Sequence, residues 1–438
     1  MELRALVYAA PNDRRELEAL LERLAGAVGG DRELSESVAG FIADVRRDGD
    51  AALVTHMRAF SDPEFDDSML RVPPRALRAA ADRIAPELRA AMERAIEHVR
   101  RYQEHIAPAP PPPVEIDGAR LGLRVEPVGS AGLLVPGGRA AYPSTLIMLA
   151  VPAQVAGVER ICLATPPPDS DRGTTKRAID DSVLAAAHLL GIGEVYCIGG
   201  SHAVAALACG TPTVPAVDFI AGPGSVYVQE AKRQLFGTVG VDGLYGPSEI
   251  AILADRSADP AWVAADVLAQ LEHDPGAAFV VSDQPEVLDR VRSALERQVR
   301  ERGRQDAIEH GLREFTAFVL AADVKEACAI MNRIAPEHAV LAVADPHAVL
   351  DRVHNAGAYF LGAAPVASGD YYAGPSHCLP TGSTARFSSG CSVYTFLRRA
   401  SLEEYPNGMT RQAIDDIAVL AEAEGLDAHA ASVRLRGD

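Results

Sequence analysis

Apolar residues in the first quarter of the chain recur at helical spacing. They repeat every three or four positions between charged side chains, which places them on one face of a helix, as in Leu17, Leu20, Leu21 and Leu24. Residues 12–106 are rich in Arg, Glu, Ala and Leu, so we predict an N-terminal helical region. The proline-rich stretch Ala107–Pro113 cannot be helical and is expected to form a short extended linker. We therefore place a helical region with its linker at residues 1–110.

Beyond residue 110 the pattern changes to short apolar runs that are bounded by Gly, Pro or Asp and alternate with helical stretches. Strands are predicted at Arg160–Thr165 and Glu194–Ile198, with a helix over 178–190 between them. The alternation restarts later, with strands predicted at Glu249–Leu253, Ala278–Ser282, Phe315–Leu320, Ala339–Val343 and Ala358–Leu361. Because such alternation is typical of parallel sheets, we predict two α/β domains, at residues 111–244 and 245–400.

The C-terminal stretch, residues 401–438, is predicted to be a small helical tail. Within it, Arg411–Glu424 carries apolar residues at helical spacing.

Composition and charge narrow the class of protein. The 438 residues are 48% hydrophobic and 23% charged, as expected for a globular protein of two or three domains. The formal net charge of −18 argues against a nucleic-acid or anionic-membrane partner, because phosphate groups would repel the chain. The N-terminus lacks a signal-peptide pattern and no stretch approaches 18 apolar residues, so we expect a cytoplasmic protein. The six dispersed cysteines include no C-x-x-C pair, and neither a disulfide framework nor a thiolate-rich zinc site is expected.

Polar residues with metal-binding chemistry occur in four separate places. A helix capped by Asp259, with Pro260 in its first turn, carries Gln270 and His273 three residues apart and on one face. That spacing can hold one metal ion, and two further ligands must come from elsewhere. Asp370 and His429 offer oxygen and nitrogen donors suited to zinc. From spacing alone this zinc site is only one interpretation.

Other polar motifs admit both a functional and a purely structural interpretation. Glu337 and His338 follow Pro336 at the entry to an apolar strand, a position where α/β folds often place site residues. Gly222-Pro223-Gly224 does not match G-x-G-x-x-G, and turn geometry alone explains it. Lys232 and Arg233 are expected on a solvated helix face.

Taken together, these motifs resemble the histidinol dehydrogenase family over roughly residues 120–435. Their order and spacing carry the resemblance: Gly222-Pro223-Gly224 with Tyr227 and Glu230-Ala231-Lys232-Arg233, Gly246-Pro247-Ser248-Glu249, Gln270-Leu271-Glu272-His273-Asp274-Pro275, Ala335-Pro336-Glu337-His338, Asn355-Ala356-Gly357, Gly369-Asp370-Tyr371 and the run from Glu424 to His429.

The resemblance implies two Rossmann-like α/β domains and an enzyme that oxidises a primary amino alcohol to the amino acid through an aldehyde. Zinc and NAD would be its cofactors. Positions that match the family's zinc ligands are Gln270, His273, Asp370 and His429. His338 matches the general base and Glu337 the residue that activates water, while the substrate-contacting positions are Ser144, Ser248, His377 and Glu424. The resemblance also implies a homodimer in which the tail of one subunit, with Glu424 and His429, completes the partner's site.

Departures from the family pattern fall at the NAD-contacting positions. Leu134, His202 and Ser225 stand where the family usually carries tyrosine, glutamine and asparagine. Each lost directional hydrogen bond removes roughly 0.5–1.5 kcal/mol, enough in total to weaken dinucleotide binding by orders of magnitude if nothing replaces it.

Three hypotheses therefore stay open. The first is an NAD-dependent histidinol dehydrogenase, and the second is a paralogue that oxidises another polar alcohol in specialised metabolism. The third is a zinc enzyme that has lost hydride transfer, or a binding protein without catalysis. Dinucleotide binding separates the first two from the third, and the substrate profile separates the first from the second.

Overall fold

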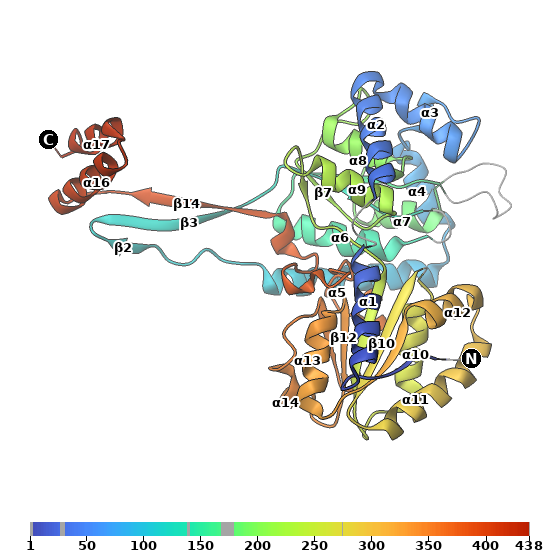
Figure 1. Cartoon of the computed structure of the whole chain (residues 1–438). Helices are drawn as coiled ribbons and strands as arrows, with labels where there is room; N and C mark the ends of the chain where they lie inside the picture. The colour runs from blue at the N-terminus through green and yellow to red at the C-terminus, as the bar shows by residue number, and fades with distance from the viewer. Residues whose placement is uncertain (1–2, 27–30, 138–140, 168–178, 274, 438) are drawn as a thin grey trace.

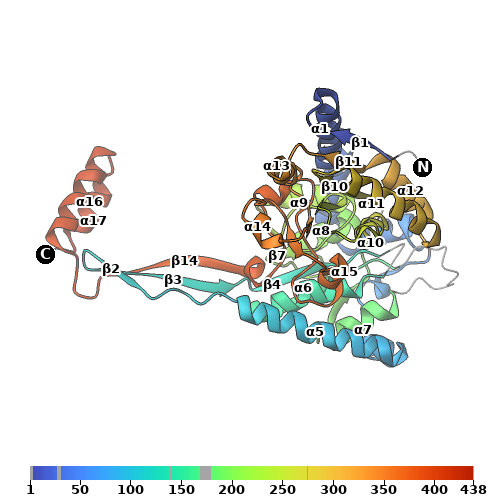
Figure 2. The same ribbon diagram turned by 90° about the horizontal axis from the view of Figure 1, so that it is seen from below.

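Two parallel sheets covered by helices form the body of the molecule, and a long arm leads away from it (Figure 1 and Figure 2). The structure is a computed structural model that describes residues 3–26, 31–137, 141–167, 179–273 and 275–437. The first sheet has the strand order 3-2-1-4-5, counted from its first strand along the chain, and the second has the same order with one further strand at its edge; this is the order of doubly wound dinucleotide-binding folds. The predicted α/β class is confirmed.

The first sheet has the order β6-β5-β4-β7-β8 and lies within a single apolar core. Its strands are β4 (Ser130–Leu134), β5 (Arg160–Ala164), β6 (Glu194–Tyr196), β7 (Phe219–Ala221) and β8 (Gly240–Val241). The helices that contribute to this core are α2 (Arg32–Asp48), α3 (Asp50–Phe60), α4 (Pro74–Arg83), α5 (Pro86–Ile106), α6 (Pro143–Ala156), α7 (Asp181–Leu189), α8 (Gly200–Cys209) and α9 (Val226–Leu235).

The second sheet has the order β1-β11-β10-β9-β12-β13 and is fully parallel. Its strands are β1 (Ala5–Val7), β9 (Ser248–Ala254), β10 (Gly276–Ser282), β11 (Thr316–Leu320), β12 (His338–Ala342) and β13 (Ala358–Leu361). The helices are α1 (Pro11–Gly26), α10 (Pro260–Leu271), α11 (Pro285–Gln298), α12 (Gln305–Glu314), α13 (Val324–Ile334), α14 (Pro346–Leu350) and α15 (Val366–Tyr371).

Alternation along β9 shows how the second sheet builds a core on each face. Ile250 and Ile252 join the core beneath α10, α11 and α12, whereas Ala251 and Leu253 join the core beneath α1 and α13. Successive strand residues point to opposite faces, and both faces are covered, so the strand is a continuous apolar run.

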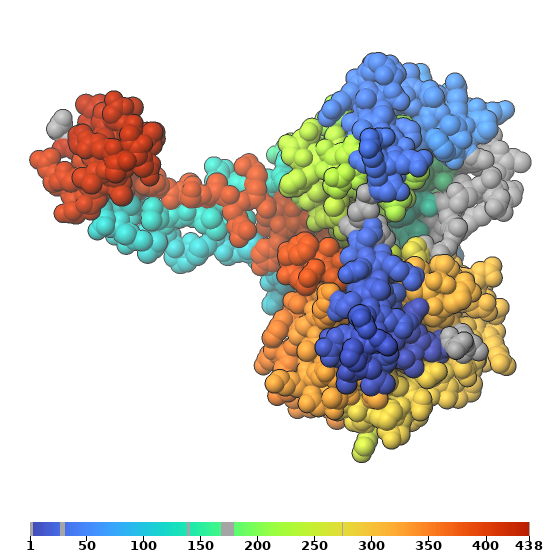
Figure 3. Space-filling view, in the orientation of Figure 1, coloured from blue at the N-terminus to red at the C-terminus, as the bar shows by residue number. Residues whose placement is uncertain are grey.

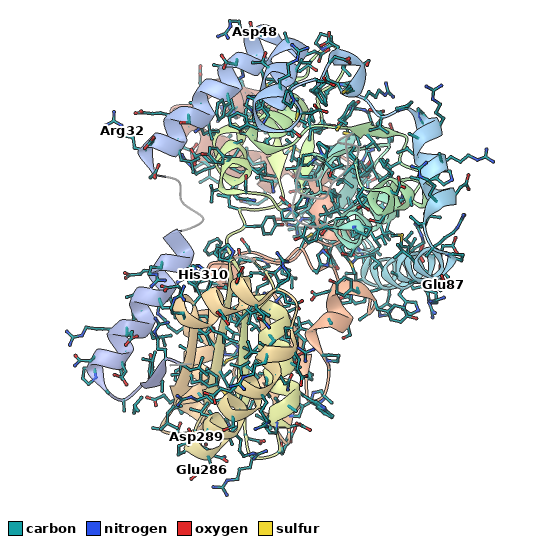
Figure 4. All side chains as sticks on the ribbon, turned by 90° about the vertical axis from the view of Figure 1, so that its right-hand side faces the viewer. Arg32, Asp48, Glu87, Glu286, Asp289 and His310 are labelled. Carbon is teal, nitrogen blue, oxygen red and sulfur yellow. The ribbon has the colours of Figure 1, made fainter. Side chains whose placement is uncertain are left out.

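The N-terminal region divides between the two sheets, a packing on which the sequence made no prediction. Residues 12–106 are mostly helical as predicted, but β1 pairs with β11 and the leucine stripe of α1 packs on the second sheet. Each sheet with the helices that cover it forms one lobe, the first lobe around β4–β8 and the second around β9–β13. Figure 4 shows α1 against the second lobe, while α2, which begins at Arg32, lies on the first. Helical spacing identifies the face that is buried, but it does not identify the surface that covers this face.

The arm is a feature that the sequence did not predict. After the expected extended linker, β2 (Val114–Ile116), β3 (Ala119–Pro127) and β14 (Leu397–Glu404) form an antiparallel sheet of order β14-β3-β2. Strands β2 and β14 are almost wholly exposed, whereas β3 is mostly half-buried and alternates apolar Leu121, Leu123 and Val125 with other residues, a strand pattern that was not among the predicted elements. The arm carries α16 (Arg411–Ala423) and α17 (Asp427–Arg434) well away from the body (Figure 3).

Short 3-10 turns complete the described secondary structure at Asp67–Met69, Val299–Glu301, Thr384–Arg386 and Val393–Phe396. Ala178, the first residue of a predicted helix, and Asp274, part of a quoted motif, lie outside the described residues. None of the described helices has the length and apolar character needed to span a bilayer.

Candidate active site

The candidate site lies where strands of the second sheet begin. Ser248 opens β9 and His338 opens the neighbouring parallel strand β12, with Glu337 one residue earlier. Gln270 lies in the last turn of α10, whose N-terminus is capped by Asp259 as the sequence indicated. Residues that are far apart in sequence therefore meet at one edge of the sheet.

Glu337 is fixed by a chain of hydrogen bonds. One of its carboxylate oxygens accepts the Ser248 hydroxyl at 2.5 Å and the Glu249 backbone N–H at 3.0 Å. The Ser248 hydroxyl oxygen in turn accepts an N–H of the Gln270 amide at 2.5 Å. Because Glu337 is 6% exposed, burial raises the pKa of its carboxyl above the ordinary value.

His338 lies between two carboxylates without a hydrogen-bond partner of its own. Its Nδ1 is 3.6 Å from Glu337 and its Nε2 is 3.5 Å from Asp370, and neither nitrogen forms a hydrogen bond among the described residues. The residue is 3% exposed. Burial by itself would lower the pKa of His338, but Glu337 and Asp370 outweigh burial and raise it. A buried imidazole with two free nitrogens is suited to exchange a proton with a ligand.

His377 connects the two lobes at the same place. Its Nδ1 lies 2.7 Å from the Asp370 carbonyl oxygen, so this nitrogen carries the proton and donates it. Its Nε2 then accepts the hydroxyl of Thr145, a residue of α6 in the first lobe, at 3.0 Å. Burial lowers the pKa of His377, which favours the neutral tautomer that this pattern requires.

Three of the four expected metal ligands lie near one another. Gln270 uses its amide nitrogen on Ser248, which leaves the amide oxygen for a ligand, and His273 follows the end of α10 with its side chain exposed. Burial would raise the pKa of Asp370, but His338, His377 and His273 outweigh it and lower the pKa, so the carboxylate form is favoured.

The fourth expected ligand is not with them. His429 lies on α17 at the far end of the arm, as does Glu424 at the C-terminus of α16 (Figure 1). Accordingly, no cluster of three or more His, Cys, Asp or Glu residues suited to a metal ion occurs in the described part of a single chain. One chain supplies Gln270, His273 and Asp370 at the site and holds His429 elsewhere.

Comparisons with known proteins agree over almost the full length. A family model described as histidinol dehydrogenase matches residues 27–437. The chain belongs to the histidinol dehydrogenase family. The histidinol dehydrogenase of Synechococcus sp. is 44% identical over 426 residues, covering 96% of each chain, and that of Oleidesulfovibrio alaskensis is 43% identical over 441 residues, covering 100% of each. The crystal structure of histidinol dehydrogenase from Elizabethkingia anophelis matches with a TM-score of 0.89 at 29% identity, over 99% of this chain and 98% of that chain.

Within this histidinol dehydrogenase family fold, the predicted substrate positions divide between body and arm. Ser144 lies in the first turn of α6, next to Thr145, whose hydroxyl reaches His377. Ser248 lies against Glu337, and only Glu424 lies far from the others, on the arm.

The three predicted cofactor positions lie at the carboxyl edge of the first sheet or in the helices that follow it, but they differ in exposure. Leu134 ends β4 and is 5% exposed within the apolar core. His202, also 5% exposed, stacks on His56 with ring centroids 3.5 Å apart. Ser225 is exposed at the N-terminus of α9, and its side chain makes no capping hydrogen bond. Only Ser225 presents its side chain to solvent.

Lys232 and Asp242 form a buried ion pair that the sequence did not predict, and the expectation that Lys232 lies on a solvated helix face was wrong. Its side chain is 0% exposed and its Nζ lies 2.6 Å from Asp242. The signal was available, because Lys232 shares a stripe at helical spacing with Val228, Ala231 and Leu235 on α9. A lysine inside an apolar stripe indicates a buried partner rather than a solvated face.

Proposed function

We propose that this chain catalyses the zinc-dependent, NAD-linked oxidation of L-histidinol through the aldehyde to L-histidine. The observation that carries the proposal is the buried His338, whose two nitrogens lack hydrogen bonds beside Glu337 and Asp370. Leaving such groups unpaired costs about 1–3 kcal/mol, which a bound alcohol would recover. Membership of the histidinol dehydrogenase family and the 43–44% identity of its relatives support the substrate assignment.

The residues of this chain divide the proton transfers between them. His338 takes the proton of the substrate hydroxyl in the oxidation to the aldehyde. Glu337, held by Ser248 and the Glu249 N–H, takes a proton from water as the water adds to the aldehyde. The gem-diol that results again has a C–H bond to lose, so a second oxidation yields the acid.

Zinc fits the donors of the proposed site. Gln270 offers an amide oxygen, His273 an imidazole and Asp370 a carboxylate, and these N and O donors suit zinc. We assign the fourth ligand to His429 of a second copy of the chain. When bound, zinc would supply a positive charge that orients the amino and ring nitrogens of the substrate.

In the proposed NAD site, backbone N–H groups are better placed to bind the dinucleotide than the side chains at the three predicted positions. The helices α8 and α9 both begin at the carboxyl edge of the first sheet without a side-chain cap, which leaves N–H groups for a pyrophosphate. Ser225 would contribute the one exposed side chain, because those of Leu134 and His202 are buried. When bound, NAD would supply the hydride acceptor.

The proposed function requires a homodimer, because Glu424 and His429 lie on the arm of each chain. This arrangement, like the cytoplasmic location expected from the sequence, stays a prediction.

Oxidation of L-histidinol with excess NAD tests the function, with NADH absorbance and L-histidine measured together. Two NADH per histidine are expected from the two oxidations. Glu337→Gln should form NADH and accumulate the aldehyde, while His338→Ala should keep its zinc and lose turnover. Wild-type protein that retains zinc but forms no NADH with L-histidinol would refute the proposal.

Subunit complementation tests the shared site separately. His429→Ala and His338→Ala should each be inactive alone. If the site is shared, co-expressed variants form mixed dimers with one intact site, and about a quarter of all sites are active in a random mixture. No activity in the verified mixed dimer would show that each site is built from one chain.

A further inference from the structure

A cavity of about 550 Å³ opens at the edge of the second sheet opposite the candidate active site. It lies beside the C-terminal end of β12, the loop after β13 and the first two turns of α10. The strand order reverses between β9 and β12, and parallel α/β sheets bind ligands at this kind of switch point.

The α10 side of this cavity combines an indole with a carboxylate. Trp262 and Asp266 are four residues apart, so they lie one turn from each other on one helix face, and both line the cavity. Trp262 is 60% exposed, so its indole is accessible to a ligand. The other walls are mostly apolar and include Val263, Val340 and Ala363.

Charge limits what the cavity can hold. No basic residue occurs among its described lining residues, and Asp259 and Asp266 are its only charged groups. Asp259 is already engaged, because its carboxylate accepts the Ala261 N–H at 2.8 Å and caps α10. The negative charge of the Asp259 carboxylate would also repel an anion at the N-terminus of α10, which argues against a nucleotide phosphate as the ligand.

We propose that this cavity binds a small organic cation that carries a flat apolar ring, such as an arylalkylammonium. The ring would pack on Trp262 and the apolar walls, and the ammonium group would pair with Asp266. The cavity opens at the end of the sheet opposite the proposed catalytic centre, and Trp262 lies eight positions, about 12 Å of helix, from Gln270. Asp266 lies closer, four positions or about 6 Å of helix from Gln270, and its charge interacts with those of Asp370 and His338.

Intrinsic fluorescence tests the proposal directly, because Trp262 is the only tryptophan in the chain. Full-length protein without substrate or NAD would be titrated with benzylammonium at pH 8, and with benzyl alcohol as the uncharged probe of the same shape. Burial raises the pKa of Asp266 to about 6, so the carboxylate predominates at that pH. A saturable change with benzylammonium is expected, with a Kd on the order of 1 mM, and at least about tenfold weaker binding of benzyl alcohol.

Two variants test the assignment of the partners. Asp266→Asn keeps the shape and removes the charge, and Ala363→Lys places a competing ammonium at the rim; each should weaken benzylammonium binding about tenfold or more. Asp289→Asn, on the exposed face of α11 (Figure 4), removes the same charge elsewhere and should bind as wild type.

The proposal would be overturned by equal binding of both probes, by unchanged binding in Asp266→Asn, or by no fluorescence change with either probe. A Trp262 that acrylamide cannot quench in the free protein would also overturn it, because a second copy of the chain would then cover the cavity. Since neither turnover nor NAD enters the assay, these outcomes are independent of the proposed function.

Discussion

Replacement of Lys232 by Met is expected to destabilise the first lobe strongly. The Lys232 Nζ donates to Asp242 and to the Gly222 carbonyl at 2.6 Å each, and to the Gly243 carbonyl at 3.3 Å. The two side chains of the ion pair are 0% and 1% exposed. Lys232→Met fills the same space with apolar atoms but leaves the Asp242 carboxylate buried without its cation.

The size of the loss follows from this burial. Removing one partner of a buried ion pair costs about 3–5 kcal/mol. Asp242 keeps hydrogen bonds from the Gly222 N–H and the Tyr245 hydroxyl, each at 2.7 Å, so we expect the lower end, about 3 kcal/mol. That is a factor of more than about 100 in the local unfolding constant. Arg32→Met, which breaks a fully exposed pair with Glu36, should change stability by about 0.5 kcal/mol or less.

Hydrogen exchange of peptides from α9 measures the change in the unfolding free energy of the first lobe. Urea unfolding followed by circular dichroism gives a second measurement of stability. The double variant Lys232→Met/Asp242→Asn should be more stable than Lys232→Met alone, because it leaves no buried charge. A loss below about 1 kcal/mol for Lys232→Met, or a double variant less stable than the single one, would refute the reasoning.

Three further changes test other buried features, and urea unfolding measures each. Burial lowers the pKa of His202 to about 3, so neutral His202 stabilises the fold fully above pH 6.5, and the free energy of unfolding falls as the pH drops toward 3. The fall is up to about 1.4 kcal/mol per pH unit, and His202→Gln should reduce it. Burial raises the pKa of Glu249 to about 8, so the protonated carboxyl stabilises the fold fully below pH 4.5, and the free energy of unfolding falls as the pH rises toward 8. Glu249→Gln should remove that fall in the free energy of unfolding. Gly222→Ala should destabilise, because φ is +124° and the new Cβ would lie 2.2 Å from the Leu134 carbonyl oxygen, whereas Gly40→Ala, with open space inside α2, should stabilise by about 0.5–1 kcal/mol.

Each of these changes has a result that would contradict it. Parallel pH profiles of variant and wild type would show that the two ionisable side chains are not responsible for the slopes. Equal effects of the two glycine substitutions would show that the turn at Gly222 tolerates a side chain.

Much of the candidate site could be predicted because its residues belong to short motifs within regular elements. The cap at Asp259 and the strand entry at His338 follow from local sequence, and both occur as predicted. The resemblance to the histidinol dehydrogenase family then added roles that spacing alone left open. The contacts of Glu249 with Glu337 could not be predicted in this way, because they depend on how two neighbouring strands align.

The sequence by itself determined the helices, most strands of the two sheets and the site motifs, because apolar periodicity and capping act over a few neighbouring residues. Only the tertiary structure decided that β1 pairs with β11, that β14 pairs with β3 in an exposed arm, and that Lys232 lies beside Asp242. Each of these pairings joins segments that are brought together only by folding. The free energy that a pairing contributes therefore depends on which segment lies opposite in the folded chain. The same reason places His429 far from His273 within one chain, because the position of α17 depends on how β14 pairs with β3 in the arm.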